Sequence, residues 1–256
     1  MLSQLIFVFL LIQAYMALWF LVSLILKRND VADFAWGLGF ILVALVLFLR
    51  WSVMLDHLGI ITVLTGIWGT RLALHIGKRL ISRGEDSRYL KWRQEWGKSV
   101  ILRSFLQVFV LQGIIMFLIC FSAAVASVSR GLPLSMSVYV GVFIWALGFI
   151  IESVADHQLS EFVVSPENKG HVMQTGLWRY SRHPNYFGEV TQWWGLFVIA
   201  LSLPFGWLAV ISPLTITAMI LFVSGIPLLE EKYAGRPEFE EYKKKTSIFI
   251  PWFPKG

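Results

Sequence analysis

Polar side chains that could hold a charged ligand gather just ahead of an apolar run in the segment GLWRYSRHPNYFGEVTQWWG, residues 176–195. Ionisable groups at or inside a bilayer are costly, and they usually mark a functional site. The alternative interpretation is a charged, aromatic-rich interfacial loop. We interpret the segment as a binding site for a polar cofactor at the membrane surface. Its candidate cofactor-binding residues are Arg179, Tyr180, Arg182, His183, Asn185, Tyr186 and Glu189.

Further charged residues lie near the ends of other apolar segments. Arg71, His75 and Arg79 are spaced four residues apart and so share one helical face, as do Glu152 and Asp156. Under the topology argued below, all of them fall in the cytoplasmic half of the membrane. Charges that snorkel from helix ends to the interface would explain Arg79 easily, but Arg71 poorly. We therefore expect Arg71 and Asp156 to line a polar cofactor cavity that opens to the cytoplasm.

Metal chemistry is not indicated by the spacing of the possible ligands. The five histidines lie in separate segments, and neither HxxxH nor HExxH occurs. Cys120 is the single cysteine, which excludes an intrachain disulfide and a cysteine zinc cluster. We expect no metal centre.

The composition indicates the elements that must position these residues. Hydrophobic residues make up 57% of the 256 positions and charged residues only 15%. Several apolar runs approach the roughly 20 residues that cross a bilayer as a helix. We predict an all-α polytopic membrane bundle that forms one domain over residues 1–256, with the cofactor-binding motif in about 135–256. The seven predicted spans are residues 2–26, 31–49, 58–80, 101–128, 135–159, 189–203 and 206–230.

The placement of basic residues predicts the orientation of these spans. With seven spans, the loops on one side of the membrane carry nearly all of the 22 lysines and arginines. Only Arg50 and Arg130 fall on the opposite side, and Arg71 lies within a span. The positive-inside rule then places the N-terminus outside and the C-terminus in the cytoplasm. The sequence pI near 9.5 therefore reflects membrane topology, and we do not read it as nucleic-acid binding.

Two polar stretches flank the predicted spans. In residues 83–99, Tyr89, Trp92 and Trp96 recur at the spacing of one face of an amphipathic helix, with basic residues between them. Such a helix would anchor to the cytoplasmic leaflet, or else it would close over the cofactor site. The tail, residues 228–254, has aromatic residues and a final apolar cluster that a disordered tail would lack, so we expect it to fold back onto the cytoplasmic end.

The motifs resemble those of the steroid 5-alpha-reductase-like superfamily, and most closely a bacterial branch of it, over nearly the whole chain. Isoprenylcysteine carboxyl methyltransferases have a similar Arg-His-Pro-x-Tyr-x-Gly segment and a similar glutamate-rich tail. The resemblance implies an integral protein of the bacterial inner membrane. The motifs that carry it are DFAWG at 33–37, WGTRL at 68–72, GEDSRY at 84–89, RHPNYFGE at 182–189 and the EE…Y…P tail.

The resemblance also implies a cofactor and its ligands. In the steroid and sterol reductases an asparagine and an acidic residue contact NADPH, and they match Asn185 and Glu189. An aspartate late in the fifth helix matches Asp156, and an arginine of the third helix matches Arg71. NADPH carries phosphates, which arginines bind through forked hydrogen bonds, whereas S-adenosylmethionine carries none. We therefore favour NADPH as the cofactor, although positive-inside charge would populate the same loops.

The chain departs from the reductases where the substrate is activated. There a glutamate of the second helix and a tyrosine of the third polarise a 3-oxo group. Asp33 stands near the glutamate position and is the candidate catalytic residue, because a buried carboxylic acid can donate a proton. Trp68 stands about where the tyrosine would be, and an indole cannot act as that acid.

These arguments lead to one main hypothesis and two alternatives. The main one is an enzyme, an NADPH-dependent reductase of a conjugated C=C bond in a lipophilic, steroid- or isoprenoid-like substrate that enters from the bilayer. The first alternative is an S-adenosylmethionine-dependent methyltransferase that acts on a lipid or prenylated substrate. The second is a non-enzymatic lipid-binding membrane protein. The sequence does not indicate an oligomeric state, and membrane lipids are the only other partner we expect.

Overall fold

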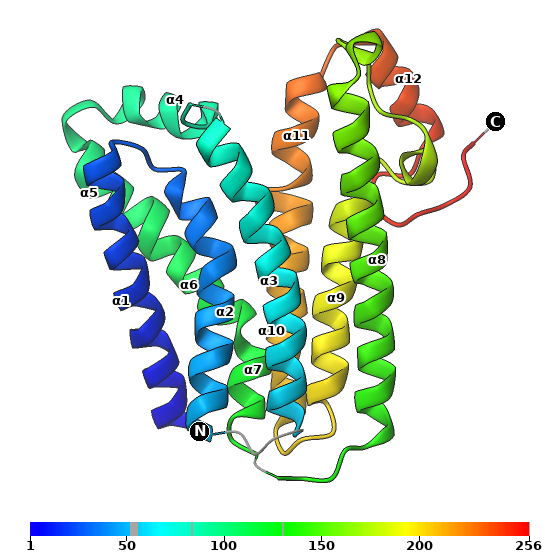
Figure 1. Cartoon of the computed structure of the whole chain (residues 1–256). Helices are drawn as coiled ribbons and strands as arrows, with labels where there is room; N and C mark the ends of the chain where they lie inside the picture. Colours follow the sequence, from blue (N-terminus) through cyan, green and yellow to red (C-terminus); the bar gives the residue numbers. More distant parts are fainter. Residues whose placement is uncertain (52–55, 83, 130, 256) are drawn as a thin grey trace. The chain divides into compact units, whose positions relative to one another are not determined.

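Helices make up the regular structure of the described residues, 1–51, 56–82, 84–129 and 131–255, in the computed structural model (Figure 1). Six of the helices are long and apolar enough to cross a membrane. The predicted all-α class is therefore confirmed, and so is an integral membrane protein. The chain divides into two compact units, Met1–Ser135 with Ala200–Ser212 and Met136–Ile199 with Pro213–Gly256, each of which is described by itself. That the whole chain forms one membrane domain stays a prediction.

The first unit contains three long helices followed by a helical segment that alternates between α-helical, 3₁₀ and π-helical hydrogen bonding. In that last helix, a 3₁₀ turn and a π-helical stretch, residues 104–110, join α-helical pieces. The bounds are α1 Leu2–Leu26, α2 Val31–Trp51, α3 His57–Ser82, α4 Ser87–Trp96, α5 Val100–Arg103, α6 Leu111–Ile119 and α7 Phe121–Ala126.

Glycines allow α2 and α3 to pack with their backbones close together. A Cβ atom added to Gly37 would lie 3.1 Å from the carbonyl oxygen of Gly69, and one added to Gly69 would lie 2.9 Å from that of Gly37. Small residues at helix contacts are the usual means of close packing between membrane helices.

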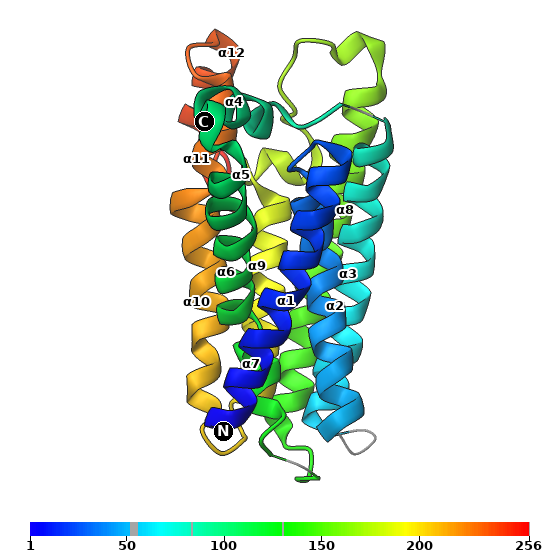
Figure 2. The ribbon, with the colours of Figure 1, turned by 90° about the vertical axis from the view of Figure 1, so that its left-hand side faces the viewer.

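The helix α4 lies across the ends of the long helices of its unit in both views (Figures 1 and 2). Asp86 caps its N-terminus by accepting a hydrogen bond from the backbone N–H of Arg88. Side chains of the turn between α1 and α2 hold the preceding loop, because Asp30 accepts from the backbone N–H of Asp86 at 3.0 Å. A helix in the predicted segment 83–99 is thus confirmed over Ser87–Trp96, whereas its anchoring to the leaflet stays a prediction.

The second unit is built on a pair of closely packed helices, α8 and α9. Gly141 and Gly148 of α8 face Gly195 and Gly188 of α9, and a Cβ atom at any of the four would lie within 2.8 Å of the opposite backbone. Pro184 begins α9, where a proline costs no helical hydrogen bond. The bounds are α8 Met136–Val164, α9 Pro184–Ala200, α10 Ile211–Ala218, α11 Ile226–Tyr233 and α12 Pro237–Lys245, with α10 starting in the first unit.

Six of the seven predicted spans match the six candidate spans, with shifted ends. The predicted span 189–203 corresponds to α9, which has 17 residues and is not among the six. At 1.5 Å per residue α9 is about 25 Å long, shorter than the roughly 30 Å of a hydrocarbon core. Its crossing and the orientation of the bundle stay predictions. Arg83 and Arg130, which enter the charge argument, lie outside the described residues.

Candidate functional site

The motif segment is anchored to α8 just before α9 begins. Gly176 opens a 3₁₀ turn, Gly176–Arg179, with a φ of 62°. A Cβ atom there would lie 2.5 Å from the side-chain amide of Gln158, so the left-handed backbone and the close approach both favour glycine. Gln158 in turn accepts a hydrogen bond from the backbone N–H of Leu177 at 2.9 Å.

The C-terminal tail pairs with this segment through its backbone. The N–H of Arg182 donates to the carbonyl of Ser247 at 2.8 Å, and the N–H of Trp252 donates to the carbonyl of Tyr180 at 2.9 Å. The hydroxyl of Ser181 donates to the carbonyl of Phe249 at 2.8 Å. The expectation that the tail folds back is therefore confirmed, and its target is the motif segment. That this end is cytoplasmic stays a prediction.

Arg182 and His183 bind one carboxylate, that of Glu230 in α11. The Nε of Arg182 donates to Glu230 at 2.8 Å, and the Nε2 of His183 lies 3.1 Å from the same oxygen. The Nη1 of Arg182 donates to the carbonyls of Thr246 and Lys243. Both Arg182 and His183 are buried, so this cluster ties the start of α9 to α11 and the tail.

Tyr242 of α12 completes the contact between the tail and the motif segment. Its hydroxyl donates to the carbonyls of Trp178 and Ser181. Burial raises the pKa of Tyr242 well above its ordinary value. The phenol therefore remains a neutral donor over the physiological pH range.

The helices α8 and α9 bring Asp156 and Asn185 together, two of the candidate cofactor ligands. The Nδ2 of Asn185 donates to Asp156 Oδ1 at 3.1 Å. The Oδ1 of Asn185 is buried and has no hydrogen-bond partner among the described residues. A buried acceptor in that state is costly, and it fits a ligand that brings an N–H or O–H donor.

A second polar pair lies further along the same two helices. The Nε2 of Gln192 donates to the buried Glu152 at 2.5 Å. The Oε1 of the same amide is buried without a partner in the described part of the chain. The sequence interpretation missed Gln192. The spacing of seven residues between Asn185 and Gln192, which puts them on one helical face, was the available signal.

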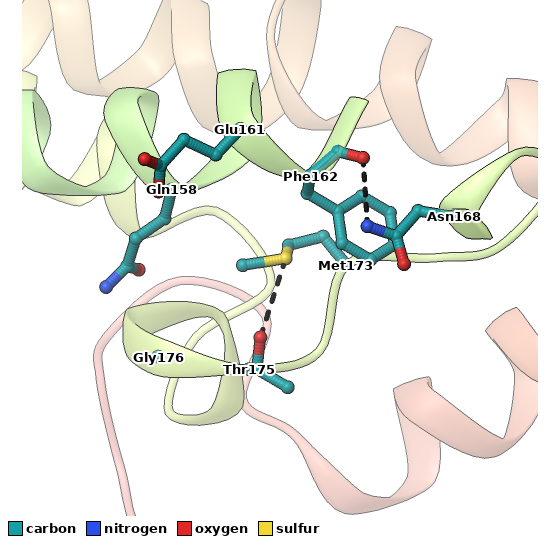
Figure 3. Close-up of a pocket in the computed structure, with 7 residues that line it drawn as sticks. All are labelled: Gln158, Glu161, Phe162, Asn168, Met173, Thr175 and Gly176. Atoms are coloured by element: carbon teal, nitrogen blue, oxygen red, sulfur yellow. Dashed lines mark hydrogen bonds between the residues drawn. The ribbon is translucent and has the colours of Figure 1, made fainter. Parts of the chain in front are cut away.

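Residues of the motif segment line two cavities. One, of about 140 Å³, has Arg182, His183 and Glu230 at its polar end and apolar walls that include Phe162 and Met173. The other, of about 350 Å³, is lined by Gln158, Glu161, Phe162, Asn168, Met173, Thr175 and Gly176 (Figure 3). Because Phe162 and Met173 line both, the cavities adjoin.

The remaining candidates of the motif segment are placed less centrally. Arg179 and Tyr180 are exposed, and the Tyr180 ring packs edge-on against Phe253. The ring of Tyr186 stacks on His183 with centroids 5.7 Å apart. Glu189 follows Asn185 by four residues on α9 and so lies on the same face. Binding of a cofactor by these residues stays a prediction, as it does for Arg182.

In the first unit, Asp33 is the centre of a separate polar cluster. It accepts a hydrogen bond of 2.6 Å from the hydroxyl of Tyr89 and one of 3.2 Å from Arg88, and Arg79 lies 3.5 Å away. The side-chain amide of Gln112 donates to the Tyr89 hydroxyl at 3.2 Å. Asp33, the candidate catalytic residue, is thus paired with a phenol that α4 supplies.

Tyr89 is a second candidate residue that sequence reasoning missed. The spacing of Tyr89, Trp92 and Trp96 predicts one aromatic face of α4, but periodicity does not tell which surface that face covers. Tyr89 is in fact only 3% exposed, and Trp92 and Trp96 stack on each other beside it. Trp68 is buried against Phe40. Arg71 also lies in this unit, on α3, and its predicted share in the cofactor site stays a prediction.

The helices and the polar clusters define a helical integral membrane protein whose Arg-His-Pro-Asn-Tyr segment is tied to its C-terminal tail. The chain belongs to the family described as "Protein of unknown function (DUF1295)", whose model matches residues 19–246.

Two kinds of enzyme are similar to part of the chain. "3-oxo-5-alpha-steroid 4-dehydrogenase 1" of Bos taurus is 29% identical over 112 residues, 44% of this chain and 40% of that protein. "Protein-S-isoprenylcysteine O-methyltransferase" of Saccharomyces cerevisiae is 29% identical over 136 residues, 48% of this chain and 53% of that protein. The chain thus spans about half the length of the curated relatives it matches or less. No solved structure matches the chain significantly.

Proposed function

We propose that the protein is an NADPH-dependent reductase of a conjugated C=C bond in a lipophilic substrate that enters from the bilayer. The observation that carries this proposal is the hydrogen-bonded pair of Asp33 and Tyr89. Reduction of a C=C bond needs a proton as well as a hydride, whereas transfer of a methyl group to a carboxylate needs no proton donor. The Tyr89 phenol, which donates to a carboxylate that Arg79 and Arg88 also contact, would supply that proton.

The residues of the second unit fit the neutral parts of NADPH. The buried, unpartnered Oδ1 of Asn185 would accept from the carboxamide or a ribose hydroxyl, with Asp156 fixing the orientation of the amide. Glu189, on the same face of α9, would accept a second hydrogen bond. Bound NADPH would supply the hydride, and these residues would set its orientation.

Arginines would hold the phosphates of the cofactor. Arg71, Arg179 and Arg182 are the candidates, of which Arg179 is exposed. Arg182 already bonds Glu230 and two carbonyls, so a phosphate would have to share or replace the bond to Glu230.

The proton would come from Tyr89. Its hydroxyl now donates to Asp33, so a substrate carbonyl that conjugates with the C=C bond would have to take over that hydrogen bond. Asp33 would then orient the phenol, and Arg88, whose guanidinium lies over the Tyr89 ring, would balance the negative charge that develops on the phenol oxygen. A hydride from the cofactor and a proton from Tyr89 would together saturate the C=C bond, and the phenolate would regain its proton from water.

Purified protein in nanodiscs, NADPH and a panel of lipophilic enones test the proposal through the loss of nicotinamide absorbance. Tyr89→Phe should abolish turnover while NADPH still binds, because the phenol supplies only the proton. Tyr139→Phe is the matched control, since Tyr139 is 63% exposed on α8. Turnover by Tyr89→Phe equal to that of the control would contradict the assignment of the proton donor.

The methyltransferase is the second candidate. The internal bonding of Arg182 favours it, because S-adenosylmethionine has no phosphate that would need this guanidinium. The similarity to the isoprenylcysteine methyltransferase covers as much of the chain as the similarity to the steroid dehydrogenase. Saturable binding of S-adenosylmethionine without binding of NADPH would favour this candidate.

A further inference from the structure

The last residues of the chain form a closed loop, which we call the tail loop, residues 245–255. Its two ends meet where the backbone N–H of Lys255 donates to the carbonyl of Lys245 at 2.9 Å. One side of the loop is fixed by the hydrogen bonds to Tyr180, Ser181 and Arg182 described above. The conformation of the loop is therefore set by hydrogen bonds at its base and along one edge.

Side chains alternate between the two faces of the tail loop. Phe249 points inward, and its ring packs against Phe187 of α9 with centroids 5.6 Å apart. On the outer face Ile248 and Ile250 are 46% and 62% exposed, and Trp252 is 69% exposed. Phe253, next to them, is 77% exposed. A loop that faced water would carry polar residues at these outer positions, because period-2 alternation puts one face on the protein and the other on the solvent.

Lysines flank this apolar outer face. Residues 243–255 contain Lys243, Lys244, Lys245 and Lys255 and no acidic residue. Lys244, Lys245 and Lys255 are exposed at the base of the loop. An exposed apolar face with a tryptophan, flanked by lysines, is complementary to a bilayer interface with anionic headgroups.

We propose that the tail loop inserts its outer face, Ile248, Ile250, Trp252 and Phe253, into the interface of an anionic membrane. The lysines at its base contact the headgroups, and the side chains enter the boundary between headgroups and acyl chains. Because the loop is bonded to the motif segment, this insertion fixes the depth of that segment at the membrane surface. The inference does not depend on the proposed reductase activity.

Site-specific fluorescence in nanodiscs tests the insertion in the full chain. Ile250→Cys is labelled with an environment-sensitive nitrobenzoxadiazole dye, and labelled wild type serves as the blank because the native Cys120 is buried. Glu241→Cys, exposed on the neighbouring α12, is the matched control. We expect a blue-shifted emission at position 250, with quenching by lipids that carry a shallow nitroxide, and neither effect at position 241.

The lipid composition distinguishes the occupants of the apolar face. Replacement of zwitterionic lipid by phosphatidylglycerol should increase the quenching at position 250, and the changes Lys244→Gln and Lys245→Gln should remove that increase. A blue shift without lipid quenching would mean that protein covers the loop, and it would overturn the proposal. Emission at position 250 as red as that of the control would also overturn the proposal. Quenching that does not change with the content of anionic lipid would overturn the role of the lysines.

Discussion

Arg182 holds three parts of the second unit together through one guanidinium, because it bonds Glu230 in α11 and two carbonyls at the end of α12. The sequence interpretation assigned this charge to a cofactor, which stays a prediction, and the structure adds Glu230 as its partner within the chain. Sequence spacing could not reveal Glu230 as the partner, since 48 residues separate the two. The tertiary fold determines which carboxylate pairs with the arginine of the motif, and the local sequence pattern gives no information about that partner.

Truncation of Arg182 should destabilise the protein strongly, because it leaves the carboxylate of Glu230 without its main counter-charge. Removing one partner of a buried ion pair costs about 3 to 5 kcal/mol. Arg182→Ala with Glu230→Gln should lose less than the sum of the two single changes. Lys243→Ala, which breaks a more exposed pair with Glu240, should cost less than about 1 kcal/mol. Unfolding in mixed micelles measures these values, and an equal loss for Arg182→Ala and Lys243→Ala would contradict the structural role.

At the scale of elements, the helices themselves were predictable, whereas their contacts were not. Hydrophobic runs long enough to cross a bilayer predicted seven spans, six of which match the candidate spans, and the aromatic spacing predicted α4. The early start of α9 at Pro184 was missed because polar residues of the motif occupy its first turns, which hydropathy alone excludes from a span. The glycine contacts between α8 and α9 come from two pairs of glycines, each spaced seven residues apart, and hydropathy carries no signal of such a contact.

The contact between α8 and α9 should fail when a glycine gains a side chain. A Cβ atom at position 188 would lie 2.5 Å from the backbone nitrogen of Glu152, so Gly188→Ala should force the two helices apart and lower the melting temperature. Gly66→Ala is the control, because nothing lies within 4 Å of its added Cβ. The control should be stabilised by up to about 1 kcal/mol, as expected for replacing a helical glycine by alanine. Equal melting temperatures of the two variants would refute the close contact.

The start of α4 should respond to acid through Asp86. Burial raises the pKa of Asp86, but the hydrogen bonds and charge of Arg88, with the charge of Arg79, outweigh burial and hold the pKa below its ordinary value. The cap therefore contributes stability above the pKa of the unfolded chain, and loses it as the pH falls through the lowered folded value. Asp86→Ala should cost about 0.5 to 2 kcal/mol at neutral pH. Hydrogen exchange of the α4 amides, measured as a function of pH, tests this prediction. Acid should reduce the protection of α4 in the wild type, and Asp86→Ala should not show that reduction.

At the scale of the whole molecule, the membrane class follows from composition, but the orientation rests on the predicted partition of charge. Reporter fusions after Ser129 and after Gly256 should fall on opposite sides of the membrane, the second in the cytoplasm, if seven segments cross it. Fusions on the same side would mean that a segment does not cross. Because α9 is only 17 residues long, it is the segment that such a result would exclude first.

The cofactor decides between the two enzyme classes most directly. Purified protein in nanodiscs is titrated with NADPH, NADH and S-adenosylmethionine at two salt concentrations. The account predicts saturable binding of NADPH in preference to both other ligands, weakened by salt because phosphates meet arginines. Asn185→Ala should weaken it further by about 1 to 3 kcal/mol, as expected for a lost buried hydrogen bond. Saturable binding of S-adenosylmethionine with no binding of NADPH would contradict the account.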